Sequence, residues 1–216
     1  MSKQGTPTMG GLMFIAAIAV VCLSVGFDCM AEGEYGHLFC LAFALVFGAI
    51  GFLDDYEKLK KKQNLGLTAG KKILLQLAAA VAFIFLMRRF GLYIPFWNKT
   101  VPISEPLYVI FAAFVIVGTV NSVNLTDGVD GLAASTTMPV CIFFAVISML
   151  WGERFLSLGV FASGIAGGLL GFLIYNFHPA KVFMGDTGSL FLGGAVAALA
   201  FAYDMPLILV TLGIMY

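Results

Sequence analysis

Residues 37–55 read HLFCLAFALVFGAIGFLDD, a long apolar run that stops at the adjacent carboxylates Asp54 and Asp55. A helix that crosses the hydrocarbon core of a bilayer needs about 20 predominantly apolar residues. The apolar residues here are continuous rather than alternating, which favours a helix over a strand of a membrane barrel. The stretch therefore predicts a transmembrane helix that ends with two acids at the membrane edge.

Comparable apolar runs recur along the rest of the chain. Of its 216 residues, 61% are hydrophobic and 11% are charged, whereas soluble domains carry roughly a quarter charged residues. The sequence predicts an all-α fold, a polytopic transmembrane helix bundle that forms one integral-membrane domain, with seven complete spans and a partial eighth. The spans are expected at residues 9–27, 37–53, 73–87, 107–123, 133–151, 155–175 and 189–203, and the partial one at 206–216.

The charges argue against nucleic acid as a partner and orient the bundle. Twelve basic and twelve acidic residues give a net charge of zero, so no global field attracts DNA or RNA. Loops rich in Lys and Arg stay in the cytoplasm, and more of the Lys and Arg residues lie on the side of the N-terminus than on the other side. That side holds Lys3, Lys58, Lys60, Lys61, Lys62, Lys71, Lys72 and Lys181, and the other holds Arg88, Arg89, Lys99 and Arg154. The N-terminus is therefore expected to face the cytoplasm.

Four polar segments gather on this predicted cytoplasmic face. They are residues 3–11 (KQGTPTMGG), Asp54-Asp55, residues 121–131 (NSVNLTDGVDG) and residues 176–189 (NFHPAKVFMGDTGS). Ionisable side chains at the edge of a membrane are costly and usually functional. Their arrival from distant parts of the chain predicts one site that is open to the cytosol.

Each polar segment also has a simpler explanation. The pair Asp54-Asp55 could be a helix end that meets water beside the following lysines, although adjacent carboxylates repel each other unless a cation lies nearby. Asn121, Asn124, Asp127 and Asp130 recur at every third position before a helix break expected at the following glycines. A solvated helix terminus is the alternative for them, but a cap needs one such side chain rather than four.

The segment FMGDTGS at residues 183–189 is typical of an anion- or metal-binding turn. Its glycines permit close approach of a ligand to the backbone, and Thr187 or Ser189 is expected to cap the next helix. Asp186 between two glycines is a natural Mg²⁺ ligand, because Mg²⁺ takes one or two carboxylates together with waters and phosphate oxygens. A plain capped turn would have the same sequence.

Together these residues indicate phosphoryl-transfer chemistry at the membrane edge. Five acids on one face, with Lys3 and glycine turns, suit a divalent ion that mediates between carboxylates and a diphosphate. The acids are Asp54, Asp55, Asp127, Asp130 and Asp186. Such a reaction needs mainly positioning and neutralisation of charge, with the metal acting as Lewis acid and template. The residues alone lead no further.

At these segments the chain resembles the bacterial phospho-N-acetylmuramoyl-pentapeptide-transferase family, part of the polyprenyl-phosphate N-acetylhexosamine-1-phosphate transferase superfamily. Four blocks carry the resemblance, in the expected order: QGTPTMGG, FLDDYEKLKKKQNLGL, NSVNLTDGVDGLA and NFHPAKVFMGDTGSLFLGG. The resemblance implies transfer of phospho-MurNAc-pentapeptide from its UDP carrier to undecaprenyl phosphate with Mg²⁺, which yields lipid I and UMP. This is the first membrane step of peptidoglycan synthesis, at the bacterial inner membrane with the active site facing the cytoplasm.

The resemblance also implies a role for individual residues. Asp54 would be the base that deprotonates the lipid phosphate, Asp55 would support the metal or the phosphates, and Asp186 would bind Mg²⁺. The substrate-binding residues would be Lys3 and Thr8 near the nucleotide-sugar phosphates, Asn176, Phe183 and Asp127 at the uridine, and Asn124 and Asp130 nearby. Direct attack by the lipid phosphate and a covalent aspartyl intermediate both remain open.

The chain also departs from the family pattern. It lacks the family's additional N-terminal span and its C-terminal His-rich loop and last span, so it is expected to be a truncated piece with little or no activity alone.

A sister transferase that uses UDP-GlcNAc remains an alternative function, and so does a transporter of an anionic substrate, although transporters bind their substrates near the membrane midplane. A purely structural scaffold would leave the aspartates unexplained. The oligomeric state is not decided, and a homodimer stays open.

Overall fold

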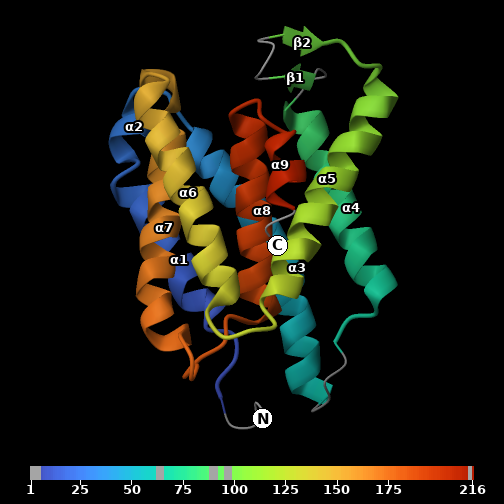
Figure 1. Ribbon diagram of the computed structural model, residues 1–216, viewed down its shortest axis with the longest axis vertical. Coiled ribbons are helices and arrows are strands. Elements are labelled where there is room, and N and C mark those ends of the chain that lie inside the picture. The colour runs from blue at the N-terminus through green and yellow to red at the C-terminus, as the bar shows by residue number, and fades with distance from the viewer. Residues whose placement is uncertain (1–5, 62–65, 88–91, 95–98, 214–215) are drawn as a thin grey trace.

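The chain folds into a bundle whose helices run roughly along one long axis (Figure 1). The computed structural model describes residues 6–61, 66–87, 92–94, 99–213 and 216. Its helices are α1 (Gly11–Ser24), α2 (Phe27–Ala31), α3 (Gly36–Lys61), α4 (Ala69–Met87), α5 (Glu105–Thr126), α6 (Leu132–Leu150), the short 3-10 helix η2 (Glu153–Phe155), α7 (Leu156–Asn176), α8 (Gly185–Ala202) and α9 (Ile208–Leu212).

Helix α8 forms the centre of the bundle (Figure 1). It packs along α3 and α5, and α1, α6 and α7 complete its surroundings. Small residues allow this close packing, since a Cβ at Gly193 would lie 2.6 Å from Val120 Cα on α5. Of the apolar stretch of α8, 83% of the residues are buried in the bundle, whereas in the apolar stretch of α4 only 22% are buried. Helices α3 and α5 are therefore positioned against α8, and α4 packs on α5 and α3.

The predicted multi-pass helical bundle is confirmed, but its spans are fewer than expected. Within the described residues, six helices are long and apolar enough to cross a membrane, namely α3, α4, α5, α6, η2 with α7, and α8. The first expected span instead consists of the 14-residue helix α1 and the separate helix α2. The chain turns between them at Gly26, where a Cβ would lie 2.4 Å from His37 Nε2. Hydropathy does not reveal such a turn because the residues around it are apolar.

Helices α3, α4 and α8 continue furthest beyond the ends that hydropathy predicts, all at the same end of the bundle (Figure 1). Helix α3 runs on to Lys61, α4 begins at Ala69 and α8 begins at Gly185. In α3, basic residues of the last turn interact favourably with the negative end of the helix dipole, and Lys61 forms an ion pair with Glu57 one turn earlier. These extensions place polar residues on regular helices where loops were expected.

The opposite end of the bundle carries a β-hairpin, which the all-α prediction did not include. Strands β1 (Leu92–Ile94) and β2 (Lys99–Val101) are antiparallel, with Tyr93 opposite Thr100. The aromatic and β-branched residues of these two short segments favour extended backbone. The hairpin lies between α4 and α5, at the end away from the chain's N-terminus (Figure 1).

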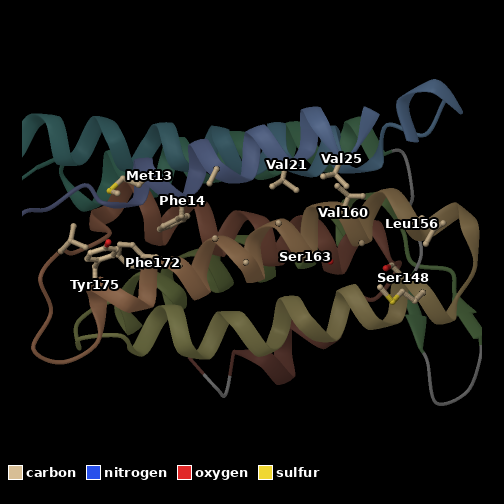
Figure 2. A pocket seen from close by; sticks show the side chains of 18 residues that line it. Met13, Phe14, Val21, Val25, Ser148, Leu156, Val160, Ser163, Phe172 and Tyr175 are labelled. Carbon is tan, nitrogen blue, oxygen red and sulfur yellow. The ribbon is translucent and has the colours of Figure 1, made fainter. Parts of the chain in front are cut away.

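An apolar groove of about 890 Å³ runs between α1 and α7 (Figure 2). Phe14 and Val21 of α1 line one side and Val160 and Phe172 of α7 the other. None of the described residues predicted for the functional site lines this groove. It belongs to the apolar outer surface of the bundle, and the predicted chemistry lies elsewhere.

Candidate active site

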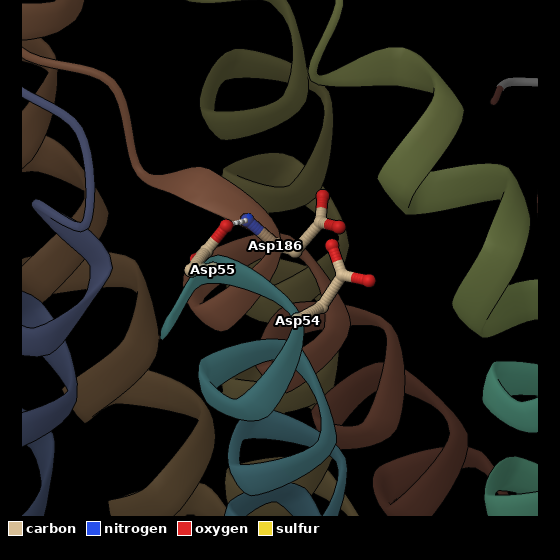
Figure 3. Close-up of side chains that lie close together, drawn as sticks. All are labelled: Asp54, Asp55 and Asp186. Carbon is tan, nitrogen blue, oxygen red and sulfur yellow. Dashed lines mark hydrogen bonds between the residues drawn. The ribbon is translucent and has the colours of Figure 1, made fainter. Parts of the chain in front are cut away.

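Three aspartates from two helices meet where α3 and α8 are extended (Figure 3). Asp54 and Asp55 lie in α3 and Asp186 lies in the first turn of α8, and one oxygen of each lies within 4.8 Å of the others. Asp54 is 3% exposed and Asp55 is 5% exposed, while Asp186 is half-buried. The fold therefore joins two of the polar segments that the sequence places on one membrane face.

A glycine one turn before the carboxylates allows the two helices to approach so closely. A Cβ at Gly51 would lie 2.1 Å from the carbonyl oxygen of Asp186 and 2.7 Å from Thr187 N. No side chain fits in that space, so the backbone of α3 contacts the first turn of α8 directly. This contact sets the height of Asp186 relative to Asp54.

Asp55 caps the N-terminus of α8 from the neighbouring helix. Its Oδ1 accepts a hydrogen bond from Asp186 N at 3.2 Å, and its Oδ2 accepts from Thr187 N at 2.9 Å and from Thr187 Oγ1 at 2.7 Å. The expected cap by Thr187 or Ser189 is wrong, because α8 begins at Gly185 and both residues lie inside the helix. The N-cap residue is Met184, which forms no side-chain capping hydrogen bond. A carboxylate is favourable there because the first N–H groups of a helix lack partners and carry partial positive charge.

Lys58 supplies the cation that adjacent carboxylates require. Its Nζ lies 2.5 Å from Asp54 Oδ2, 2.9 Å from Asp186 Oδ2 and 3.9 Å from Asp55 Oδ1. The other oxygen of Asp54 accepts a hydrogen bond from Leu67 N at 2.8 Å. Both oxygens of Asp54 are thus engaged, and one ammonium bridges the two helices.

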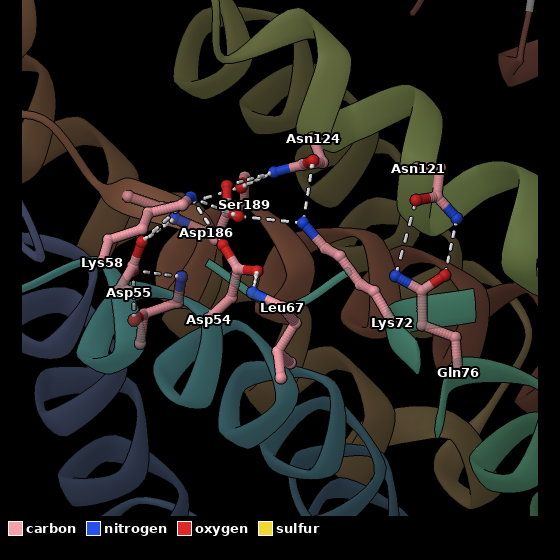
Figure 4. A network of polar contacts seen from close by, with 12 residues as sticks. Asp54, Asp55, Lys58, Leu67, Lys72, Gln76, Asn121, Asn124, Asp186 and Ser189 are labelled. Atoms are coloured by element: carbon pink, nitrogen blue, oxygen red, sulfur yellow. Dashed lines mark hydrogen bonds and ion pairs between the residues drawn. The ribbon is translucent and has the colours of Figure 1, made fainter. Parts of the chain in front are cut away.

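A second lysine approaches Asp186 from α4 (Figure 4). Lys72 Nζ lies 2.9 Å from Asp186 Oδ2 and 3.5 Å from Asn124 Oδ1. The amide nitrogen of Asn124 donates to Asp186 Oδ1 at 2.9 Å and to Ser189 Oγ at 2.7 Å. Asp186 therefore receives donors from α3, α4 and α5, which makes it the centre of the network.

The asparagines and aspartates at residues 121–130 do not form one cluster. Helix α5 continues to Thr126, so Asn121 and Asn124 lie one turn apart on a helix, and Asp127 is at the C-cap. Asp130 lies in the connection to α6, where its Oδ2 is 3.0 Å from His178 Nδ1 and accepts from Ala180 N at 3.1 Å. Asn124 is the residue of this segment that donates to Asp186.

Asn176, at the end of α7, joins two of the polar loops. Its Oδ1 accepts from Gly131 N at 3.1 Å and its Nδ2 donates to the carbonyl of Val182 at 2.8 Å. The residue is 2% exposed. In this structure its amide holds the α5–α6 connection against the α7–α8 connection, and the uridine contact expected for it stays a prediction.

Comparison with known proteins identifies the family to which this arrangement belongs. Residues 37–204 match the model of glycosyl transferase family 4, and residues 3–15 match the first signature of phospho-N-acetylmuramoyl-pentapeptide-transferase. The chain is 47% identical to the phospho-N-acetylmuramoyl-pentapeptide-transferase of Caldanaerobacter subterraneus subsp. tengcongensis, over 100% of this chain and 67% of that protein. The chain belongs to the phospho-N-acetylmuramoyl-pentapeptide-transferase family.

Other relatives agree on the family and on the share that is covered. The transferase of Clostridium botulinum is 43% identical over 100% of this chain and 65% of its own length. That of Staphylococcus carnosus is 41% identical over 100% of this chain and 68% of its own length. The chain thus spans about two thirds of the length of these relatives. Together with the six long apolar helices among the described residues, this membership makes it a multi-pass membrane protein.

The family signature lies directly beside the aspartates. Phe183 N donates to the carbonyl of Pro7 at 2.9 Å, and Gly10 N donates to the carbonyl of Phe183 at 2.8 Å. A Cβ on Gly185 would lie 3.2 Å from Thr8 Oγ1 and 2.7 Å from Asp55 Oδ2. Thr8 is therefore brought to the first turn of α8, and Lys3 lies outside the described residues.

The transferase family and the aspartate cluster together imply a metal-dependent enzyme, and the donor set fits a hard divalent cation. Carboxylate oxygens are the ligands that such cations prefer. Lys58 Nζ bridges one oxygen each of Asp54 and Asp186, so these two oxygens already face a common positive charge. Asp55 has both oxygens engaged with α8. Oδ2 of Asp54 and Oδ2 of Asp186 instead face a side-chain ammonium that a metal ion could replace, so these two residues are the ones suited to hold an ion.

Neither lysine of this candidate site was predicted to be functional from the sequence. Lys58 is four residues after Asp54, and residues at that spacing are neighbours on a helix. The spacing would have indicated the pair if α3 had been continued past the apolar run. Lys72 carried no comparable signal, because its position follows from the packing of α4 beside α5 and α3.

Proposed function

We propose that this chain is part of a membrane enzyme that transfers phospho-N-acetylmuramoyl-pentapeptide from UDP-MurNAc-pentapeptide to undecaprenyl phosphate, giving lipid I and UMP. The observation that carries the proposal is the meeting of the family signature with Asp54 and Asp186 at one end of the bundle. A site at this edge suits a soluble donor and an acceptor anchored in lipid.

We place this end of the bundle at the cytoplasmic face of the bacterial plasma membrane. Lys58, Lys72 and Lys181 lie at the end with the aspartates, and Arg154 lies at the other end beside α7. An excess of Lys and Arg marks cytoplasmic loops. A nucleotide-activated donor from the cytosol would then reach the site without crossing the membrane.

The reaction exchanges one phosphorus–oxygen bond for another. Overall, an oxygen of the acceptor phosphate bonds to the phosphorus that carries the sugar, and the bond from that phosphorus to UMP breaks, so that UMP leaves with the electron pair. Asp54 is the proposed base for the acceptor phosphate. Its Oδ2 is paired with Lys58, so we propose that an incoming phosphate draws Lys58 away and frees this oxygen to accept the proton.

Mg²⁺ is the proposed metal, held by Asp186 with Asp54 beside it. When bound, Mg²⁺ would neutralise the diphosphate and polarise the reacting phosphoryl group. Asn124 would fix the Asp186 carboxylate through its hydrogen bond to Oδ1. Asp55 would act through the N-terminus of α8, because its three hydrogen bonds set the position of the Asp186 backbone.

The donor would lie across the signature segment and the two polar loops. Lys3 and Thr8 are proposed for its phosphates, and Phe183 and Asp127 for the uridine. Asn176 and Asp130 would support that pocket by joining the loops, as their contacts with Gly131, Val182 and Ala180 indicate. The half-buried ring of Phe183 offers a surface on which a base would stack.

A chimera tests the proposal. Residues 1–216 replace the matching segment of the Caldanaerobacter relative, so that the remaining length is supplied by a named transferase. Membranes with the chimera receive labelled UDP-MurNAc-pentapeptide and undecaprenyl phosphate, and labelled lipid product is extracted and counted. Lipid product is expected from the parent chimera. Its formation should fall by about 100-fold or more in Asp54→Asn and Asp186→Asn, and the exposed control Asp28→Asn should keep the parental rate.

Two results would overturn it. Transfer from UDP-GlcNAc in place of the muramoyl donor would assign the chain to the sister activity. Undiminished transfer in Asp54→Asn would exclude Asp54 from the chemistry, as expected of a protein that only binds or transports the anionic substrate.

A further inference from the structure

A pair of amide side chains joins α4 to α5 one helical turn from the aspartate network (Figure 4). Asn121 Nδ2 donates to Gln76 Oε1 at 2.6 Å and to the carbonyl of Val117 at 2.8 Å, and Gln76 Nε2 is 3.5 Å from Asn121 Oδ1. Gln76 is completely buried although it lies in an apolar helix. A buried amide in such surroundings is costly unless it is paired, so each amide requires the other.

The register of α4 depends heavily on this pair. Helix α4 buries only Gln76, Ala80, Phe83 and Ile84, and Gln76 is the polar one and the nearest to Lys72. Phe83 packs against Phe43 at a centroid distance of 3.8 Å, toward the other end of the helix. If α4 rotated or slid by one residue, its apolar side chains would still face apolar surroundings, but both amides would lose their partner. A buried polar pair of this kind specifies register in helix packing.

The same register delivers two of the groups that hold Asp186. Lys72 precedes Gln76 by four residues on α4, and Asn124 follows Asn121 by three residues on α5, so each amide lies on the same helix face as one group of the network. Lys72 and Asn124 then form a second contact between these helices, 3.5 Å long, and both reach Asp186 at 2.9 Å.

We propose that Gln76 and Asn121 are positioning residues for the transfer reaction, whose interlocked amides fix α4 against α5 so that the Lys72 ammonium and the Asn124 amide meet at Asp186. The proposal rests on the proposed function for its catalytic consequence. Its structural part, the placement of Lys72, does not depend on the identity of the reaction.

Amine-reactivity provides a test that needs no activity. The chain in detergent is treated with a small amine-reactive reagent, and the modification of Lys72 is measured by mass spectrometry relative to exposed Lys60. The Lys72 side chain is 15% exposed and paired. We expect severalfold faster modification in Gln76→Met and Asn121→Leu, and parental protection in the control Leu74→Ala, whose side chain is 68% exposed on the same helix.

Activity in the chimera separates positioning from general destabilisation. We expect kcat to fall by about 100-fold, the loss typical when a group is misplaced by about 1 Å, while KM for the donor changes little. The exchange Gln76→Asn with Asn121→Gln keeps one amide on each helix and should recover part of kcat and of Lys72 protection. In a Lys72→Met background, Gln76→Met should add little, because Gln76 acts through Lys72.

The outcomes decide between the alternatives. Should a variant fail to assemble, Asn121→Ser provides a milder break, because serine still bonds to the carbonyl four residues earlier. Unchanged Lys72 protection in the variants, with or without a loss of thermal stability, would overturn the proposal and leave the pair a purely structural contact. If the parent chimera transfers nothing, the proposed function fails, while Lys72 reactivity still tests the placement.

Discussion

Asp55 on α3 and Thr187 on α8 form a two-point contact, in which one carboxylate oxygen accepts both the backbone N–H and the hydroxyl of Thr187, at 2.9 and 2.7 Å. The other oxygen accepts the N–H of Asp186 at 3.2 Å. Asp55 therefore uses both of its oxygens to attach α8 to α3, while Asp54 lies beside Lys58. Two adjacent residues of one type thus have different tasks, because a helix turns their side chains in different directions.

Removal of this cap should destabilise the fold. Asp55→Ala is expected to lower the free energy of unfolding by about 2 kcal/mol, the upper range for loss of a helix cap, because three donors lose their acceptor. Thermal unfolding of the chain in detergent measures the change. Thr187→Val should show a smaller loss, since only the hydroxyl bond disappears. An equal effect of Asp28→Ala at the surface would contradict the assignment.

The contact at Gly51 should tolerate no side chain. Gly51→Ala would drive its methyl group to 2.1 Å from the carbonyl oxygen of Asp186, so α3 and α8 must separate and the aspartates with them. Lipid-product formation by the chimera is expected to fall at least 100-fold, as for misplaced catalytic groups. Gly118→Ala is the matched control, because nothing lies within 4 Å of its Cβ position. It should be neutral or stabilise by about 0.5 kcal/mol.

The sequence predicted the helical membrane fold and the meeting of Asp54 with Asp186, because both follow from apolar runs and from the side on which each loop lies. The ends of the helices were less predictable. Hydropathy marks where a chain leaves the apolar phase, but α3 continues to Lys61 through charged residues that favour helix there. Lys58 was missed for this reason.

The individual hydrogen bonds and ion pairs between distant helices could not be predicted. The cap of α8 comes from Asp55, 132 residues away from Thr187, and the placement of Lys72 follows from packing rather than from any local pattern. The helix break expected at Gly128 and Gly131 is confirmed, since α5 ends at Thr126, and it separates the polar residues at 121–130. Asn121 and Asn124 therefore face α4, while Asp130 joins the α7–α8 connection.

The amide of Asn176 should hold the two polar loops together. Asn176→Leu leaves Gly131 N–H and the Val182 carbonyl without a partner, and each buried unsatisfied group costs about 1–3 kcal/mol. We expect faster tryptic cleavage after the exposed Lys181, measured by mass spectrometry under native conditions in detergent. Ser24→Leu is the control, because the Ser24 hydroxyl bonds only within its own helix, to Val20. An unchanged cleavage rate in Asn176→Leu would show that other contacts hold the loop.

Lys58 and a divalent ion should substitute for each other electrostatically. Lys58→Met leaves Asp54 and Asp186 facing each other, with Lys72 as the remaining ammonium beside them among the described residues. We therefore expect the free energy of unfolding to fall by about 2 kcal/mol, the range for hydrogen bonds to charged groups. Mg²⁺ should raise the unfolding temperature of this variant more than that of the parent, because the ion then meets uncompensated carboxylates. Lys61→Met should change little, since ion pairs at the surface, such as that of Lys61 with Glu57, contribute little to stability. A Mg²⁺ response equal in the parent and in Lys58→Met would place the ion away from these two aspartates.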